Sequence, residues 1–376
     1  MVKVLQIVGG LRRAGTETWL LQVARRINRS AIVMDFLVHG EEEGDYEEEL
    51  RDLGFGIVRT PMPGRYAAYV RSVGAAFERG GYDVVHSHLQ HFGGVTTFLA
   101  SRHGIPLRIV HSHSDVQPNL ARSRKAPYAW VMLRLIRRHA THRIAVSQRA
   151  AAALFGADWS QQPNTAILSC GIDLAPFLEP ADTGLRASLG LRPGGLVIGH
   201  VGRFVEEKNH DMLLAVAAEV MDRDPGAQLL LVGEGPRRLQ MEQACTALGI
   251  RNRTIFAGSR NDVPEVLKAA VDVFVFPSRR EGLGLAIVEA QAAGLQCVIA
   301  DHIPAEVEVL PELIHRHSLA DPPSAWAATV SRVRHLYDGR AAANRVSATA
   351  YNIDCSVRWL ERLYTEGHLT SAELAA

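Results

Sequence analysis

Short apolar runs followed by stretches with helical spacing recur along the first half of this chain. The runs predict strands, and the stretches between them predict helices. The predicted strands cover residues 2–8, 31–40, 56–60, 83–86, 107–110 and 143–147. Strands that alternate with helices indicate an α/β fold with a parallel sheet, because parallel neighbours need a long crossover connection. In such sheets, ligands bind at the carboxyl ends of the strands.

The length of the chain requires more than one core. A chain of 376 residues is too long for a single hydrophobic core and fits two domains of ordinary size. Residues 171–186 are rich in Pro, Gly and acids, which is typical of a linker. We therefore expect a first domain over residues 1–170, a second domain over residues 187–351 and a terminal helix over residues 352–376.

Composition excludes several classes of protein. Apolar residues make up 47% of the chain, and no apolar run approaches the length needed to span a bilayer. The start of the chain runs directly into a predicted strand, without a charged and then apolar leader. The four cysteines lack the spacing of a disulfide framework or a zinc site. We expect a cytoplasmic protein that is soluble or peripheral at the inner face of the membrane.

Basic residues are concentrated in the first half of the chain. Of the Lys and Arg residues, 21 precede residue 171, against 14 acids. The segment that begins at Arg122 and ends at Arg143 has seven of them, no acid, and the aromatic residues Tyr128 and Trp130. A basic amphipathic helix can dock on an anionic membrane or hold a phosphorylated lipid-linked acceptor. A solvated helix face is an equal alternative, and no nucleic-acid motif accompanies the segment.

Two acids stand out in residues 277–298, which read PSRREGLGLAIVEAQAAGLQCV. This stretch predicts a strand end, a glycine turn, an Ala-rich helix and the start of the next strand. Glu281 lies in the turn, and Glu289 is expected about two helical turns inside the helix, on the face of Leu285. A helix start favours an anion in front of it, and an acid with apolar flanks needs a partner. The less favoured alternative is that Glu281 is an ordinary acid at a helix start and that Glu289 is a solvated residue on the helix face.

Two cations follow a buried strand in the second half. The turn at Gly202 comes after that strand, and Arg203 and Lys208 precede a helix expected to begin near Asn209. Two positive side chains beside a glycine turn suit a diphosphate or another anionic group.

Four histidines follow two neighbouring predicted strands. His86 and His88 come at the end of one strand, and His111 and His113 come at the end of the next, both written HSH. Metal binding is the first hypothesis for such a group. No acid or cysteine completes a convincing ligand set in the sequence, so we expect no metal site.

Residues 277–298 resemble the signature of the family 4 glycosyltransferases, in which Glu, seven residues and Glu close the nucleotide-sugar site. The glycines and small residues match as well as the acids, while Gln296 stands where the family usually has Pro. Cys170 stands where the family commonly has the Asn of Asn-Gly-Ile-Asp. Within the family, AGTETWLLQVARR, DFLVHG and RIVHSHSD resemble bacterial exopolysaccharide and capsule transferases. The resemblance implies two Rossmann-like domains facing a cleft, of the GT-B type, with the terminal helix crossing back to the first domain.

The resemblance also implies a reaction. A retaining transferase of this kind would move a sugar from a nucleotide diphosphate sugar, with UDP expected, to an acceptor hydroxyl. It would need no metal and no other cofactor. The acceptor stays open among carbohydrates, lipid-linked molecules and small molecules.

The family's site residues carry over to matching positions. Arg203 and Lys208 would hold the diphosphate, Glu281 the donor sugar and Glu289 the ribose. The histidine near donor and acceptor would be His111 or His113, with His111 favoured. The further nucleotide-sugar contacts expected are Gly15, Arg260, Gly282, Leu283, Gly284 and Leu285, and those expected in the acceptor pocket are Thr16, His86 and His88.

Two rival functions fit the same pattern. A nucleotide-sugar epimerase or a phosphorylase on this architecture would keep the nucleotide or phosphate contacts without a separate acceptor. A non-catalytic binding subunit of a transferase pair would keep the contacts without turnover.

Overall fold

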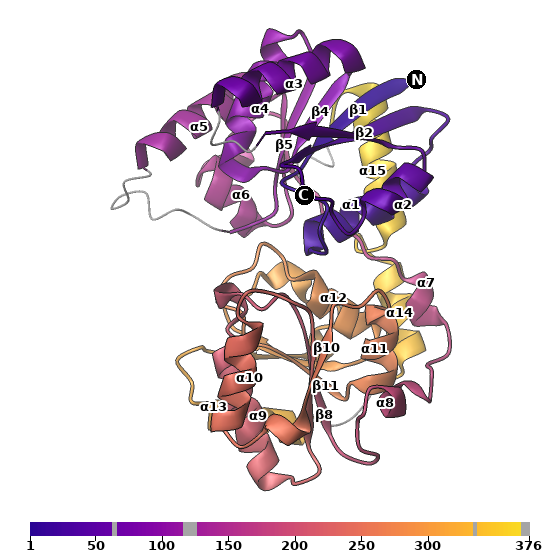
Figure 1. The fold of residues 1–376 in the computed structure, drawn as a ribbon, viewed down its shortest axis with the longest axis vertical. Helices are drawn as coiled ribbons and strands as arrows, with labels where there is room; N and C mark the ends of the chain where they lie inside the picture. The colour runs from indigo at the N-terminus through magenta and orange to yellow at the C-terminus, as the bar shows by residue number, and fades with distance from the viewer. Residues whose placement is uncertain (62–65, 116–125, 334–336, 370–376) are drawn as a thin grey trace. The chain divides into compact units, whose positions relative to one another are not determined.

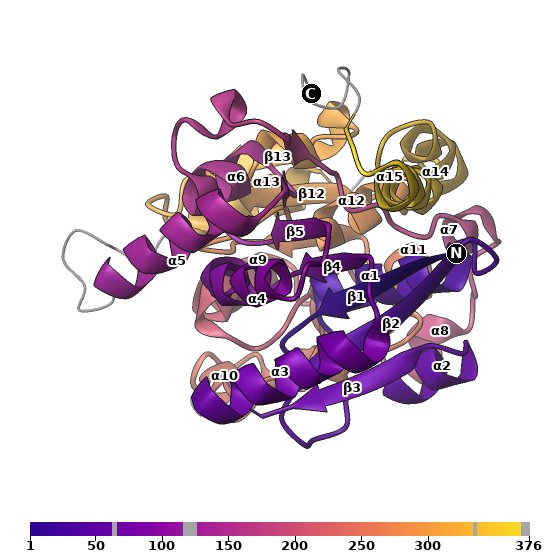
Figure 2. The ribbon, with the colours of Figure 1, turned by 90° about the horizontal axis from the view of Figure 1, so that it is seen from above.

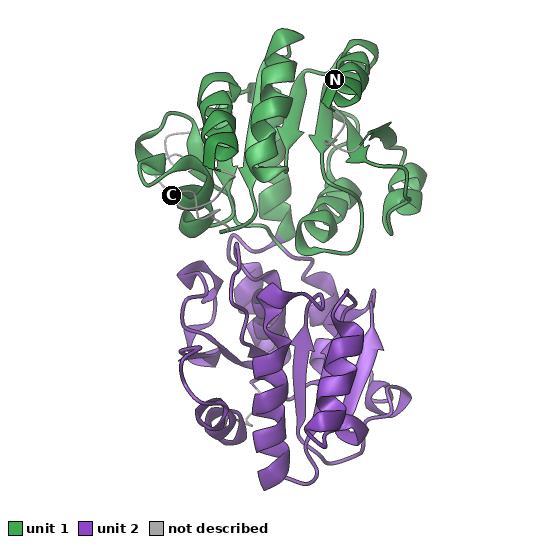
Figure 3. Ribbon diagram, turned by 60° about the vertical axis from the view of Figure 1, so that its left-hand side comes forward, with its two compact units in different colours: residues 1–171, 353–376 green, residues 172–352 purple. Residues whose placement is uncertain are grey.

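The computed structural model describes residues 1–61, 66–115, 126–333 and 337–369. The chain divides into two compact units, Met1–Gly171 with Ile353–Ala376, and Ile172–Asn352 (Figure 3). The two crossings between the units lie side by side, since Ile172 N–H donates to Tyr351 O at 2.8 Å. Residues 171–186, expected to form a linker, lie almost entirely in the second unit and contain a short helix, α7 (Ala175–Leu178).

The first unit is built on a seven-stranded parallel sheet with the order β3-β2-β1-β4-β5-β6-β7. Its strands are β1 (Val2–Ile7), β2 (Ile32–His39), β3 (Gly56–Thr60), β4 (Val84–Ser87), β5 (Leu107–Ser112), β6 (His142–Ala145) and β7 (Thr165–Ile167). All six strands predicted in this half are present.

Helices cover both faces of this sheet (Figures 1 and 2). Figure 2 shows α3, α4 and α5 next to one another on one side, while α1 packs with α15 on the other. The helices are α1 (Gly15–Arg26), α2 (Glu47–Asp52), α3 (Tyr66–Gly80), α4 (Gly93–Arg102), α5 (Ala126–His139), α6 (Gln148–Phe155) and α15 (Ile353–Glu366). The return of α15 to the first unit confirms the expected crossing of the terminal helix.

The second unit has a six-stranded parallel sheet with the order β10-β9-β8-β11-β12-β13. Its strands are β8 (Val197–Val201), β9 (Gln228–Val232), β10 (Thr254–Gly258), β11 (Val273–Phe276), β12 (Gln296–Ala300) and β13 (Ile314–His317). The helices around it, beside α7, are α8 (Leu185–Ser188), α9 (His210–Arg223), α10 (Arg238–Ala247), α11 (Val263–Ala270), α12 (Leu285–Ala292), α13 (Pro323–Arg332) and α14 (Gly339–Ser347).

Each sheet reverses its strand order at one place. The first unit grows outward from β1 to β3 and then resumes with β4 on the other side of β1. The second grows from β8 to β10 and resumes with β11 beside β8. At such a switch point the loops leave in opposite directions and open a crevice outside the strand ends, where ligands of α/β proteins bind. These two places are therefore where functional side chains are sought.

No helix in the described part of the chain is long and apolar enough to cross a membrane.

Candidate functional site

The switch point of the second unit brings Lys208 and Glu281 together. Lys208 ends a short 3-10 turn after β8, Glu281 lies in the loop after β11, and the Lys208 ammonium contacts a Glu281 carboxylate oxygen at 2.6 Å. The two side chains are 21% and 12% exposed. The ammonium also lies over the ring of Phe276, 4.8 Å from its centroid. Two residues 73 positions apart thus form a partly desolvated ion pair, as the sequence pattern had grouped them.

The turns around Lys208 need glycine. A Cβ on Gly202 would lie 2.9 Å from His200 Nε2, and one on Gly233, which has a φ of +137°, would lie 2.2 Å from Gly202 O. The backbones after β8 and β9 therefore approach each other more closely than side chains permit. Arg203 follows Gly202 directly, is exposed, and makes no ion pair among the residues that the structure describes.

Glu289 lies less deep in its helix than expected. The helix α12 begins only at Leu285, because Gly284 before it has a left-handed φ of +104°, so Glu289 lies one turn from the helix start and not two. Its carboxylate is partly exposed and has no hydrogen-bond or ion-pair partner within the described ranges. Desolvation raises the pKa of Glu289 from 4.5 to about 7. A carboxylate with this environment is poised to accept hydroxyl donors from a ligand.

Asn209 and Arg279 join the loops that carry the ion pair, and the sequence analysis missed both. Asn209 has a left-handed φ of 52°, and its amide nitrogen donates to Pro277 O at 3.1 Å. Its amide oxygen accepts from Arg279 Nη2 at 2.9 Å, while Arg279 N–H donates to Glu207 O at 2.6 Å. Asparagine tolerates left-handed backbone better than most residues, so Asn209 directly before a helix start was a usable signal.

Arg260 is not brought to this group. It follows the edge strand β10, which β9 separates from β8. Both ends of its guanidinium bind the carboxylate of Asp262, at 2.7 and 2.6 Å. This pairing lowers the pKa of Asp262 and engages the cation expected to contact the nucleotide base. The other expected contacts, Gly282, Leu283, Gly284 and Leu285, follow Glu281 in the turn that leads into α12.

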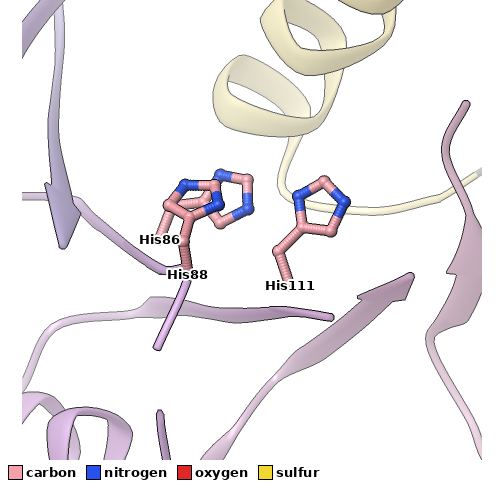
Figure 4. A group of neighbouring side chains, drawn as sticks. All are labelled: His86, His88 and His111. Carbon is pink, nitrogen blue, oxygen red and sulfur yellow. The ribbon is translucent and has the colours of Figure 1, made fainter. Parts of the chain in front are cut away.

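The switch point of the first unit holds all four histidines. His86 and His111 end β4 and β5, and their rings are stacked at 5.3 Å with an angle of 11°. His88 and His113 follow the same strands, with 5.0 Å between ring centroids. Figure 4 shows His86, His88 and His111 from this group. The two HSH sequences, which were expected to follow neighbouring strands, thus meet at the carboxyl ends of β4 and β5.

A hydrogen-bonded chain runs through this histidine group. His113 Nε2 lies 2.8 Å from His88 Nδ1, and His88 Nε2 lies 2.9 Å from Gln6 Oε1. The amide nitrogen of Gln6 donates to the hydroxyl of Tyr364 at 2.9 Å, and this hydroxyl lies 2.7 Å from His86 Nδ1. Tyr364 belongs to α15. Neither Gln6 nor Tyr364 was predicted from the sequence as a member of the group.

His111 and His113 differ in how much of their surface is exposed. His111 has no exposed surface, and neither of its ring nitrogens has a partner among the described residues. His113 is partly exposed. Burial lowers the pKa of His111 well below 6.5 and that of His113 to about 3, so both rings are neutral at pH 7. Of the two, only His113 has a surface that the described residues leave exposed.

The histidine group contains side chains that could act as metal ligands. His86, His88 and His111 each offer one nitrogen within 4.8 Å of the others, and His111, His113 and Cys170 form a second such group. Cys170, expected to lie in the linker, has its sulfur 4.0 Å from His113 Nδ1. Both nitrogens of His88 already face hydrogen-bond partners, and the His86 and His88 rings overlap with centroids 4.3 Å apart. A metal ion held by His88 would have to displace its bond to His113 or its bond to Gln6.

Gly15 and Thr16 lie at the start of α1, one turn before Trp19. The Trp19 ring is buried and contacts the rings of His88, His111 and His113 at centroid distances of 6.3, 5.5 and 5.9 Å. The start of α1 thus lies one helical turn from a ring that contacts the histidine group.

The basic segment is only partly described. Arg122, Arg124 and Lys125 lie outside the described residues, and Arg143 lies in β6 and not in the expected helix. On α5, Tyr128, Trp130 and Val131 are 41%, 63% and 42% exposed, and the Arg134 guanidinium lies 5.8 Å from the Trp130 ring centroid. The helix therefore presents aromatic and basic side chains on one outer face.

Comparisons with known proteins agree with this arrangement. Residues 14–171 match the glycosyl transferase 4-like domain, and residues 182–353 match the family described as glycosyl transferases group 1. EpsF of Bacillus subtilis (strain 168), named as a glycosyltransferase, is 34% identical over 343 residues, which cover 88% of this chain and 87% of that protein. A D-inositol 3-phosphate glycosyltransferase of Actinosynnema mirum is 30% identical over 74% of this chain and 71% of its own length.

Solved structures show the same fold. HepE of Anabaena, in complex with UDP and glucose, has a TM-score of 0.78 at 19% identity and covers 97% of this chain and 100% of its own. WaaG, a glycosyltransferase of lipopolysaccharide biosynthesis, has a TM-score of 0.73 at 16% identity and covers 96% of this chain and 99% of its own. Both parallel-sheet units thus have the Rossmann-like form of GT-B proteins.

Proposed function

From the premise that this chain belongs to the group 1 glycosyltransferases, with a family 4-like first domain, we propose that it moves a sugar from a UDP-sugar to an acceptor hydroxyl. The configuration at the anomeric carbon is retained, and no metal takes part. The observation that carries the proposal is the Lys208–Glu281 ion pair, 2.6 Å long, at the switch point of the second unit. It places a cation for the leaving diphosphate next to an acceptor for sugar hydroxyls.

The ion pair opens when the donor binds. A diphosphate oxygen that approaches the Lys208 ammonium gives it a second anionic partner, which releases one Glu281 oxygen to accept a sugar hydroxyl. Arg203, which is exposed and directly follows Gly202 in the same turn, adds a second positive charge. Charge-assisted hydrogen bonds of this kind strengthen as negative charge develops on the leaving group, so they favour the transition state over the ground state. With two cations available, metal-free departure of UDP is reasonable.

Glu289 is assigned to the ribose. Its carboxylate has no partner in the described part of the chain, and burial solvates its charge poorly, which raises its pKa. Two ribose hydroxyl donors would compensate that charge, which an amide could do only in part. UDP is favoured as the leaving group because HepE, with the same fold, was solved with UDP.

In the first unit, the accessible His113 is assigned to the donor sugar and acceptor, in place of the buried His111. No carboxylate stands out as a nucleophile among the site residues. We therefore favour attack on the same face of the sugar, with the leaving phosphate assisting departure of the acceptor proton, over a covalent glycosyl intermediate.

The acceptor is proposed to belong to polysaccharide or glycolipid synthesis, since EpsF is among the most similar proteins. A lipid-linked acceptor at the inner face of the cytoplasmic membrane is consistent with the aromatic and basic face of α5. Peripheral binding through that face is part of the proposal.

The test uses the full chain with EDTA, a panel of UDP-sugars and candidate acceptors. Release of UDP that depends on an acceptor, with a product of the same anomeric configuration as the donor by NMR, is the expected result. An inverted product would overturn retention, and activity restored only by a divalent cation would overturn metal independence. Conversion of the UDP-sugar without acceptor would identify an epimerase instead, and UDP binding without turnover would identify a binding subunit.

A further inference from the structure

Five polar side chains from distant parts of the first unit form one buried chain of hydrogen bonds. Gln6 comes from β1, His86 and His88 from the end of β4, His113 from the loop after β5, and Tyr364 from α15. Figure 4 shows two of its rings, His86 and His88, next to α15. Gln6 is fully buried and lies directly opposite His86 in the sheet register.

The orientation of the Gln6 amide determines which atoms donate and which accept in this series of hydrogen bonds. Its nitrogen donates to the Tyr364 hydroxyl at 2.9 Å and lies 3.2 Å from the sulfur of Met34. Its oxygen is therefore the atom that faces His88 Nε2, at 2.9 Å. An amide oxygen only accepts hydrogen bonds, so His88 Nε2 must carry the proton.

The protonation of one ring then decides the next. Burial lowers the pKa of His88 well below 6.5, so its ring is neutral and carries a single N–H. With that proton on Nε2, His88 Nδ1 is bare and must accept from His113 Nε2 at 2.8 Å. His113 is neutral as well, which leaves its Nδ1 bare. Within the described part of the chain, the polar contact of this nitrogen is the thiol of Cys170, at the long distance of 4.0 Å.

We propose that Gln6, with its amide held by Tyr364 of the terminal helix, is a positioning residue that fixes the tautomer of His113 through His88. His113 then offers its bare Nδ1 as an acceptor for a substrate hydroxyl, and it is unsuited to an anion. The role of His113 at the substrate rests on the proposed transfer reaction. The tautomer itself does not, and it can be measured in the resting protein.

The first measurement is the NMR detection of histidine tautomers in the full chain labelled with ¹⁵N-histidine. The wild type is expected to carry N–H at Nε2 of both His88 and His113. Gln6→Met keeps the shape but removes the acceptor, so His88 moves its proton to Nδ1, donates it to His113 Nε2, and drives the His113 proton to Nδ1. Gln6→Glu keeps an acceptor and keeps the wild-type tautomers. Met34→Leu, which removes only the other contact of the Gln6 amide, is the matched control.

Tyr364→Phe provides a second test in case Gln6→Met does not fold. It removes one hydroxyl and leaves the ring, so the Gln6 amide loses a partner that holds its orientation and both histidines show a mixture of tautomers. Three results would overturn the proposal. These are an Nδ1–H tautomer of His113 in the wild type, unchanged tautomers in Gln6→Met, and a stoichiometric transition metal in the purified protein that coordinates His88.

The second measurement is the transfer reaction in the same variants. Gln6→Met is expected to lower kcat about tenfold, the effect of one lost hydrogen bond, while the Kd for UDP stays unchanged. Gln6→Glu should restore most of the rate. If the tautomers change as expected and kcat does not, the tautomer chain stands and the role assigned to His113 in transfer fails. If no variant or wild type transfers sugar at all, the proposed function fails and the NMR result still decides the chain.

Discussion

The two units have the same topology at their switch points and opposite chemistry. Between β8 and β11 lies an ion pair, Lys208 with Glu281, and the helix that follows carries Glu289, which has no partner among the described residues. Between β1 and β4 lie neutral rings and amides, because burial lowers the pKa of every histidine in the group. The topology places a crevice at each point. The residue types at the strand ends decide that one suits a charged diphosphate and the other an uncharged hydroxyl.

The largest effect is expected from Lys208→Ala. Loss of this cation removes the charge that stabilises the departing diphosphate, and kcat/KM should fall about a thousandfold. Steady-state release of UDP measures it, with Arg223→Ala, a surface cation of the same unit, as the control. A variant that keeps more than a tenth of the wild-type rate would show that the charged switch point does not hold the leaving group.

His113→Ala tests the other side of the comparison. If His113 orients hydroxyls without touching the nucleotide, its removal should lower kcat about a hundredfold and leave UDP affinity unchanged. Single-turnover rates and calorimetry with UDP separate the two quantities. His111→Ala removes a buried ring and should chiefly lower the midpoint of thermal unfolding. Equal losses of kcat in both variants at matched stability would contradict the distinction between them.

Glu289→Gln should weaken UDP binding about tenfold, because the amide oxygen accepts less strongly than a carboxylate and its nitrogen cannot accept at all. Calorimetry at one pH above 7 measures it. Unchanged affinity would remove Glu289 from the ribose site. Glu242→Gln, on an exposed helix of the same unit, serves as the comparison.

The pKa of Glu289 also predicts a pH dependence. Because the folded carboxyl titrates at about 7 against 4.5 in the free side chain, its contribution to stability is complete below pH 4.5. That contribution decreases as the pH rises and is lost above about 7. Donor affinity should move the other way and rise across pH 7, where the carboxylate forms. Glu289→Gln should flatten both profiles, and an unchanged unfolding profile would show that Glu289 is solvated in the fold.

The smallest effect concerns the outer face of α5. Trp130→Ser should lower binding to vesicles containing anionic lipid about threefold, since one exposed aromatic side chain supplies part of the contact. Cosedimentation measures it, and Leu239→Ser, which changes an exposed apolar residue of the second unit, is the control. Equal losses for both variants would show that the first unit has no special membrane face.

The sequence predicted what depends on local pattern. Strand positions followed from apolar runs, and the grouping of Lys208 with Glu281 followed from the resemblance to the family 4 glycosyltransferases. Contacts between residues that are far apart in the sequence could not be predicted from it. Gln6 and Tyr364 lie 358 positions apart, and nothing in either segment marks a polar role. The engagement of Arg260 by Asp262 depends on side-chain rotamers, and the depth of Glu289 depends on the left-handed Gly284.

The neighbouring crossings at Ile172 and Asn352 make the second unit an insertion within the first. A ribosome releases Gln6 early and Tyr364 only after the whole second unit has been made. The second unit can therefore fold while the chain is still growing, whereas the first must keep an unfinished sheet face open until α15 arrives. The hydrogen bond between Gln6 and Tyr364 is then among the last contacts of the first unit to form, because it needs α15.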